Sequence, residues 1–336
     1  MTLKSIFSAI LLALIVSSCT NDPLEVDVSG ISVDIEYIDM DAVFVNSDSA
    51  TLVKKCVSYK KNIKDVYEYQ LGRCLQMGDL PLKDLYDSIQ SFLKLPYTVR
   101  LEKAIAKEFS DKTEMEEKIT DGFKHLSYHF PDKKLPSSIV FLNSAFAGSA
   151  ISMEDDMAIG LDRYLGKESP VIRELPSKDF YDWIKEAMDR QFLERDVMAS
   201  WIMTNIIEQP SGSLVENIIY WGKVNYFIEA CYPDDEEHII IRYNQEDYDW
   251  AIEHEILYWE YLVDQNMLFK LDERTQMNML KEGPFTPGLP DQAPDRLGQF
   301  LGWRMVKQYM ANHSDLKLSD LAKKDYNSIL QEYEIE

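Results

Sequence analysis

The stretch Asp295-Arg296-Leu297-Gly298-Gln299-Phe300-Leu301-Gly302-Trp303 places two glycines four residues apart in an otherwise apolar run. Helical spacing continues beyond it, so the sequence predicts a helix over Asp295–Asn312 with both glycines on one face. Each internal glycine costs up to about 1 kcal/mol relative to alanine. Close approach of another backbone segment is the usual compensation, so we expect this face to meet a second element of the core.

Outside this helix, the sequence predicts a few short strands among many helices. Apolar or alternating runs predict strands at Ile35–Ile38, Ser138–Leu142 and Met157–Leu161. Further segments have helical spacing: Ser49 to His129 with interruptions near Gly78–Pro81 and Pro96, Lys178–Asn205, Ser213–Cys231, Gln245–Met267, Asp272–Glu282 and Ser319–Glu334. The fold class predicted is α+β, mainly helical around a small sheet.

Composition excludes several classes of protein. The chain has 336 residues, of which 46% are hydrophobic, so a large core is available and disorder is not expected. Its formal net charge of −23 repels phosphate backbones, which argues against nucleic-acid binding. There is no Gly-Lys-Ser/Thr phosphate loop and no Gly-x-Gly-x-x-Gly motif, so we expect no nucleotide cofactor.

The N-terminus predicts a lipoprotein signal. Lys4 precedes an apolar run, and Leu14-Ile15-Val16-Ser17-Ser18-Cys19 forms a lipobox that ends at Cys19. The uninterrupted apolar run is much shorter than the ~20 residues that span a bilayer, so it indicates a cleaved signal. We expect a lipid on Cys19 to anchor the mature protein in a membrane. Cleavage leaves 34 basic and 58 acidic residues, a net charge of −24.

These signals predict three parts of the chain. Residues 1–18 form the signal peptide, residues 19–33 a lipidated tether, and residues 34–336 a single helical-rich α+β domain. Thr20 gives no inner-membrane retention signal of the aspartate kind, and Asn21-Asp22-Pro23 is not an acidic export cluster. We therefore expect an outer-membrane protein that faces the periplasm.

Three cysteines remain after lipidation, and an odd number leaves at least one thiol unpaired. Cys56 and Cys74 are 18 residues apart in a region with helical spacing, while Cys231 is distant in sequence. On one straight helix the first two would lie roughly 27 Å apart, beyond disulfide reach. We expect a protein that is stable without disulfides.

The histidines do not form a recognised zinc motif. Only His125 and His129 have the spacing of two zinc ligands on a helix, and Leu126 stands where a general base would follow the first. His254 lies between Glu253 and Glu255, but adjacent helical residues point to different faces. We expect no bound metal, while a hydrolase with an atypical site at His125, His129 and nearby acids stays open.

Several spaced motifs resemble one known family. In order they are Trp221-Gly222-Lys223 to Cys231-Tyr232-Pro233, Tyr243, Trp250…Glu255…Trp259, Glu282-Gly283-Pro284-Phe285-Thr286 and Asp295 to Trp303. With the lipobox, this order resembles the gliding-motility lipoprotein GldB family of Bacteroidota. The resemblance covers most of the mature chain and is strongest from Ala150 onward. It implies a non-catalytic lipoprotein that acts in gliding motility or a related envelope process through contacts with envelope proteins.

The family is in turn distantly similar to gluzincin peptidases. The resemblance places their metal-binding helix at Lys178–Asn205, which contains no histidine, and a further ligand near Trp221–Glu229, where Gly222-Lys223 stands. It therefore implies a degenerate zincin-like scaffold without its metal.

The old cleft of such a scaffold is the candidate partner site, and a peptide-binding module is a further alternative. Arg296 and Arg304 either pair with internal carboxylates or face such a cleft. The candidate cleft residues are Arg195, Trp221, Lys223, Glu255, Arg296 and Trp303.

Overall fold

A computed structural model describes residues 23–78 and 80–335, and Cys19 with its lipobox lies outside these residues. The described chain contains a four-stranded mixed sheet in the order β1-β2-β4-β3. Its strands are β1 (Glu36–Asp39), β2 (Ser138–Leu142), β3 (Ala150–Ser152) and β4 (Asp156–Gly160). The first three in spatial order are parallel, and β3 pairs antiparallel with β4 at the edge.

Helices make up most of the remaining structure. In the first half they are α2 (Met40–Asn46), α3 (Ser49–Asn62), α4 (Lys64–Glu68), α5 (Leu82–Leu93), α6 (Pro96–Glu108), α7 (Thr113–His129), α8 (Pro170–Arg173) and α9 (Asp182–Glu186). In the second half they are α10 (Leu193–Trp201), α11 (Leu214–Cys231), α12 (Glu237–Ile240), α13 (Gln245–Glu253), α14 (Glu255–Asp264), α15 (Glu273–Leu280), α16 (Leu297–Asn312), α17 (Leu318–Leu321) and α18 (Tyr326–Leu330). This confirms the predicted α+β class.

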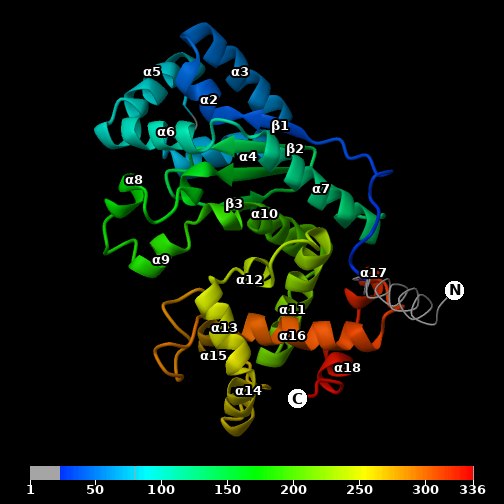
Figure 1. The fold of residues 1–336 in the computed structure, drawn as a ribbon. Helices are drawn as coiled ribbons and strands as arrows, with labels where there is room; N and C mark the ends of the chain where they lie inside the picture. Colours follow the sequence, from blue (N-terminus) through cyan, green and yellow to red (C-terminus); the bar gives the residue numbers. More distant parts are fainter. Residues whose placement is uncertain (1–22, 79, 336) are drawn as a thin grey trace, which may run out of the picture.

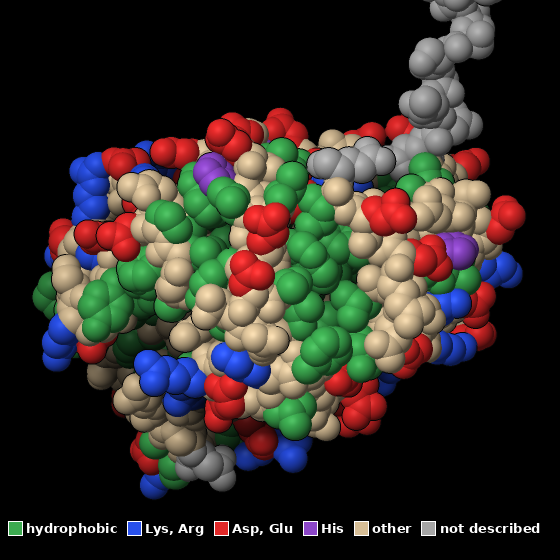
Figure 2. Space-filling model, turned by 90° about the horizontal axis from the view of Figure 1, so that it is seen from below, with side chains coloured by type: hydrophobic (Ala, Val, Ile, Leu, Met, Phe, Trp, Pro, Cys, Tyr) green, Lys and Arg blue, Asp and Glu red, His purple; other side chains and the backbone are tan. Residues whose placement is uncertain are grey.

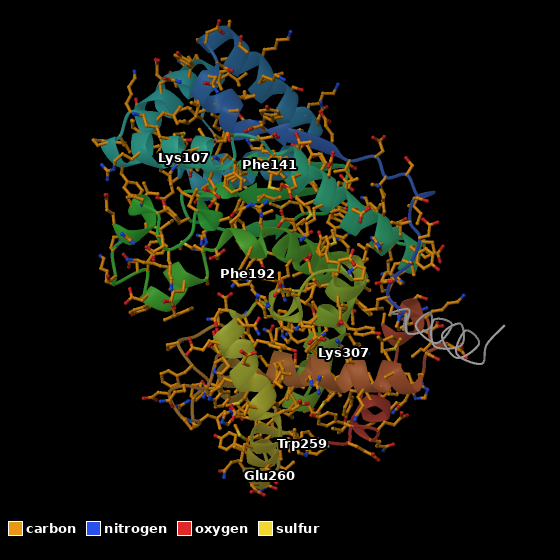
Figure 3. The ribbon with its side chains drawn as sticks, viewed as in Figure 1. Lys107, Phe141, Phe192, Trp259, Glu260 and Lys307 are labelled. Atoms are coloured by element: carbon orange, nitrogen blue, oxygen red, sulfur yellow. The ribbon has the colours of Figure 1, made fainter. Side chains whose placement is uncertain are left out.

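The sheet separates two apolar clusters because successive residues of a strand point to opposite faces. Val140 and Ala158 pack with the cluster from α2, α3, α4 and α5. Ile139 and Phe141 pack with the larger cluster that includes α7, α10, α11 and α16. Figure 1 shows α2, α3 and α5 above the sheet and α10 below it, and Figure 3 labels Phe141 within the side chains at the sheet.

The two glycines of the opening stretch lie in α16, which crosses α11. A Cβ atom added to Gly302 would collide with the backbone carbonyl of Ile218, and one added to Gly222 would collide with Gly302 itself. At Gly298 an added Cβ would lie 2.8 Å from the carbonyl oxygen of Met279. The predicted close approach of a second backbone element is therefore confirmed. The capping box of Ser213 and Glu216 fixes the start of α11.

Two predicted helices are broken in the structure. The segment Lys178–Asn205 is divided into α9, the 3₁₀-helix Arg190–Phe192, α10 and the π-helix Ile202–Ile206. The Lys185 side chain donates hydrogen bonds of 3.1 and 2.9 Å to the carbonyls of Arg173 and Leu175, which holds α9 against the preceding loop. The segment Ser319–Glu334 likewise contains only α17, α18 and turns. Apolar spacing persists across both breaks, so it does not reveal them.

A third predicted helix, Gln245–Met267, divides into α13 and α14 at His254. The imidazole of His254 stacks on Trp250 with ring centroids 4.1 Å apart, and the Trp250 carbonyl lies 2.9 Å from its Nδ1. This local contact accompanies the turn of the chain between the two helices.

The described cysteines are free thiols, and all three are buried. The prediction of a fold without disulfides is confirmed for them. In the segment expected to be a tether, Leu24 and Val28 are buried against the rest of the protein. Within residues 23–78 and 80–335, the helices are too short or too polar to cross a membrane.

Candidate functional site

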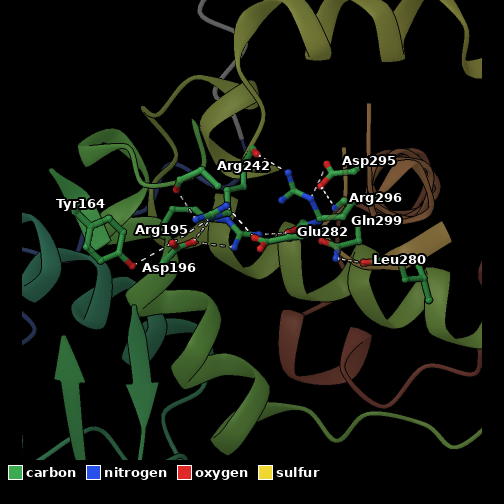
Figure 4. Close-up of polar contacts among 12 residues, drawn as sticks. Tyr164, Arg195, Asp196, Arg242, Leu280, Glu282, Asp295, Arg296 and Gln299 are labelled. Atoms are coloured by element: carbon green, nitrogen blue, oxygen red, sulfur yellow. Dashed lines mark hydrogen bonds and ion pairs between the residues drawn. The ribbon is translucent and has the colours of Figure 1, made fainter. Parts of the chain in front are cut away.

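A cleft of about 590 Å³ lies where α10 and the start of β3 face α11, the end of α15 and the start of α16. Its walls include Trp183 and Trp221. The lining also contains six charged side chains: Arg195, Arg242, Lys281, Arg296, Asp196 and Glu282. Figure 4 shows the polar contacts that connect the three arginines with the acids. The cleft therefore gathers four cationic side chains within a strongly acidic protein.

Arg195 projects from α10 and is 5% exposed. Its Nε donates to the carbonyl of Ile240 at 2.8 Å, and its Nη2 donates to Oδ1 of Asn225 at 2.7 Å. The carboxylate of Asp196 lies 3.4 Å from its Nη1. Burial, together with the nearby charges of Arg242 and Arg296, lowers the pKa of Arg195 to about 10 against the opposing effect of Asp196. The positive charge of Arg195 is thus incompletely balanced.

Arg242 lies at the centre of the ionic cluster. Its Nε donates to both oxygens of Asp196, at 2.9 and 3.1 Å, and its Nη1 donates to Glu282 at 2.9 Å. Tyr164 donates to the same Asp196 carboxylate at 3.1 Å. Burial alone would lower the pKa of Arg242, but Asp196 and Glu282 raise it above its ordinary value. The guanidinium therefore stays charged.

Arg296 immediately precedes α16 and has a left-handed backbone, with φ of 54°. Its Nε donates to Asp295 at 2.9 Å, and its Nη2 donates to the carbonyl of Arg242 at 3.0 Å. Gly283 N–H donates to the other oxygen of Asp295. The Nη1 of Arg296 has no hydrogen-bond partner among the described residues.

Three of the six residues predicted for a cleft lie together in it: Arg195, Trp221 and Arg296. Arg296 was expected either to pair with an internal carboxylate or to face a cleft. It does both, because it pairs with Asp295 and also lines the cleft. Arg304 pairs with the carboxylate of Glu255 at 2.9 Å.

The other three predicted residues do not line this cleft. Trp303 is fully buried, and its Nε1 donates to Glu229 at 2.7 Å. Lys223 points toward the C-terminal segment, where its Nζ donates to the carbonyl of Lys324 at 2.6 Å. Glu255 pairs with Arg304 and accepts a hydrogen bond of 2.7 Å from Tyr333. Each of these three side chains makes hydrogen bonds within the fold.

Sequence reasoning did not select Asp196, Arg242, Glu282 or Lys281 for the site. They come from the body of α10, a turn after α12 and the loop after α15, so no sequence spacing relates them. The one indication of this site in the sequence was the adjacent pair of opposite charges, Arg195-Asp196. It lies in α10, a helix that is otherwise largely buried.

The histidines considered as zinc ligands lie in α7. Nδ1 of His125 lies 3.0 Å from the carbonyl of Asp121. Burial lowers the pKa of His129 to about 4, and its Nε2 is buried without a hydrogen-bond partner. Within the part of the chain that the structure describes, no three His, Cys, Asp or Glu side chains converge as a metal site.

Comparison with known proteins identifies the family of the chain. The family model described as gliding motility protein GldB matches residues 21–334, which include both the α11–α16 crossing and the cleft. No curated protein and no solved structure matches the chain. The distant similarity to gluzincin peptidases therefore stays a prediction. Because the match covers nearly the whole sequence, the chain belongs to the gliding motility protein GldB family.

Proposed function

We propose that the protein is a lipid-anchored, non-catalytic component of the cell envelope that acts in gliding motility by binding other envelope proteins. The observation that carries this proposal is the family match over residues 21–334. The lipobox that ends at Cys19 supports the lipid anchor. The finer location, at the periplasmic side of the outer membrane, follows from the residues after Cys19 and is part of the same proposal.

Exposed apolar side chains support a role in protein contacts. Among the described residues, fourteen large hydrophobic side chains are exposed, and half of them lie between Ile252 and Met277 in α13, α14, α15 and their connections. Figure 2 shows hydrophobic side chains gathered between acidic ones on the face seen from below. Contiguous exposed apolar surface is typical of interaction sites.

The rival function is a metal-dependent hydrolase that uses His125 and His129. Purified protein incubated with zinc and then desalted gives a direct test, with His125→Ala and His129→Ala as variants. We expect no stoichiometric zinc in any of the three proteins. Zinc retained at one ion per chain by the wild type and lost from both variants would overturn the non-catalytic proposal.

Gene deletion in the native host tests the motility role and the anchor together. We expect the deletion to abolish spreading on agar, the wild-type gene to restore it, and Cys19→Ser to fail despite equal protein levels on an immunoblot. A deletion strain that spreads normally would contradict the motility role. Full rescue by Cys19→Ser would contradict the requirement for a lipid anchor.

A further inference from the structure

The cleft has an excess of positive charge. Four of its lining side chains are cationic and two are acidic, and Asp295, which pairs with Arg296, adds a third acid, so one positive charge is left in excess within a chain of net charge −23. Both oxygens of Asp196 already accept hydrogen bonds from Arg242, and Tyr164 donates to one of them. This acid therefore has little capacity left for a further cation. The charge excess is available to an incoming anion.

Donor groups in the cleft are also left unused. Nη1 of Arg296 has no partner among the described residues, and Lys281 makes no ion pair with any of them. Glu282 is the acid at the rim, with a side chain that is 47% exposed, yet it neutralises one nitrogen of the buried Arg242. Because the carboxylate of Glu282 reaches solvent, a ligand carboxylate can take its place beside Arg242 without leaving that guanidinium unpaired.

The backbone holds two of the arginines in an unusual conformation. Arg242 and Arg296 have φ values of 61° and 54°, and they are two of six described non-glycine residues with positive φ. Such a conformation costs roughly 1–3 kcal/mol per residue and is concentrated at ligand clamps and active sites. The strain is maintained by contacts that include the hydrogen bond from Arg296 to the carbonyl of Arg242.

We propose that this cleft binds a carboxylate carried by an extended segment of a partner protein, with Arg296, Arg242 and Lys281 as its donors. A guanidinium presents a planar fork that matches a carboxylate. The volume of about 590 Å³ accommodates a few peptide residues, and Trp183 and Trp221 supply aromatic walls for them. Glu282 is the internal carboxylate that the ligand replaces. The choice of a protein as ligand rests on the proposed function.

Tryptophan fluorescence and calorimetry on the purified full-length protein test the proposal. The probes are an N-acetylated tripeptide with a free C-terminal carboxylate, its C-terminal amide, and inorganic phosphate. We expect the acid to bind at least about tenfold more tightly than the amide, because the amide lacks the charge that the arginines recognise. Equal affinities for acid and amide, no binding of the acid, or tighter binding of phosphate would each overturn the proposal.

Variants separate ligand binding from structure. Arg296→Gln should weaken binding of the acid about tenfold, whereas Glu282→Gln should strengthen it several-fold by removing the competing carboxylate. Arg304→Gln is the matched control, since Arg304 lies on the same helix but does not line the cleft, and it should leave affinity unchanged. An Arg296→Gln protein that fails to fold is replaced by Lys281→Gln, an exposed change with the same expected direction. If Glu282→Gln leaves the affinity for the acid unchanged or weakens it, Glu282 is not a carboxylate that the ligand replaces.

These measurements are independent of the deletion phenotype. If the purified protein binds the acid but the deletion strain spreads normally, only the motility role is refuted. Conversely, a deletion phenotype with no binding of the acid in vitro would refute only the carboxylate site.

Discussion

Helix α16 takes part in two regions that are stabilised in different ways. In its middle, the crossing with α11 depends on the missing side chains of Gly222 and Gly302, because the two backbones are in contact. At its start, Arg296 joins a cleft in which the arginines pair with Asp295 and Asp196 and one positive charge is left in excess. The crossing should therefore be sensitive to added volume and the cleft to lost charge.

Near the crossing, Glu229 and Lys307 are charged groups that pair with each other. Glu229 of α11 accepts hydrogen bonds from Trp303 at 2.7 Å and from Lys307 at 2.8 Å. Burial raises the pKa of Glu229, and Lys307 opposes this effect. Figure 3 labels Lys307 on α16. This pair links the two helices, and Lys307 also pairs with Glu237, so Lys307 has no charge left for an anionic ligand, in contrast to the cleft.

The largest effect is expected in the cleft, for Arg242→Met. The substitution leaves the carboxylate of Asp196, which is 8% exposed, without its bidentate partner. Removing one member of a buried ion pair typically costs about 3–5 kcal/mol, so we expect a loss of this size in the free energy of unfolding. Urea titration followed by circular dichroism measures it.

A double-mutant cycle with Asp196→Asn is the control for this prediction. If the cost comes from a buried carboxylate left with only Tyr164 and the 3.4 Å contact of Arg195, the double variant should be more stable than Arg242→Met alone, with a coupling energy above about 1 kcal/mol. Additive effects would mean that the two side chains act independently. The cleft would then not be specifically sensitive to lost charge, as the comparison with the crossing requires.

The next effect is expected at the crossing, for Gly302→Ala. The new methyl group would meet the backbone carbonyl of Ile218, which cannot move aside as a flexible side chain can. Overpacking of a core typically costs about 1–3 kcal/mol, and we expect the upper end of this range in a thermal unfolding experiment. Gly72→Ala is the matched control, because nothing lies within 4 Å of its added Cβ. Equal stability of the two variants would show that the helices are not in close contact.

The crossing could be predicted from the sequence because its signal is local. Two glycines at helical spacing within an apolar run have few explanations other than close packing. The strands at Ser138–Leu142 and Met157–Leu161 were also predicted, the first with its observed bounds and the second within one residue. Strand β3 was not, because three residues are too few to display an alternating pattern.

The cleft could be predicted only in part, because its residues are distant in sequence. Arg195, Trp221 and Arg296 were selected from the resemblance and from their charge, whereas Arg242 follows an apolar run with no special spacing. The positive φ of Arg242 and Arg296 is a tertiary property that residue type does not reveal. Lys223 was selected together with Trp221, which lies two positions before it. Each position along a helix turns the side-chain direction by about 100°, so the side chain of Lys223 lies on a different face from that of Trp221.

The smallest effect concerns Lys223, which follows Gly222 at the crossing and has only carbonyl partners within hydrogen-bond distance. Burial lowers its pKa to about 8, against the weaker opposing effect of Asp325. Above pH 8 the unfolded chain therefore keeps a proton that the folded protein has released, and the free energy of unfolding rises with pH. We compare the wild type with Lys223→Met, which lacks this proton.

Between pH 7.5 and 9 the wild type should gain about 1 kcal/mol of stability relative to Lys223→Met, because one pKa unit corresponds to ~1.4 kcal/mol. Urea midpoints measured at four pH values in this range give the difference. A difference independent of pH would mean that Lys223 keeps its proton throughout, which requires a carboxylate close to it. The crossing would then pair a buried cation with a carboxylate as the cleft does, and the middle and the start of α16 would differ in packing alone.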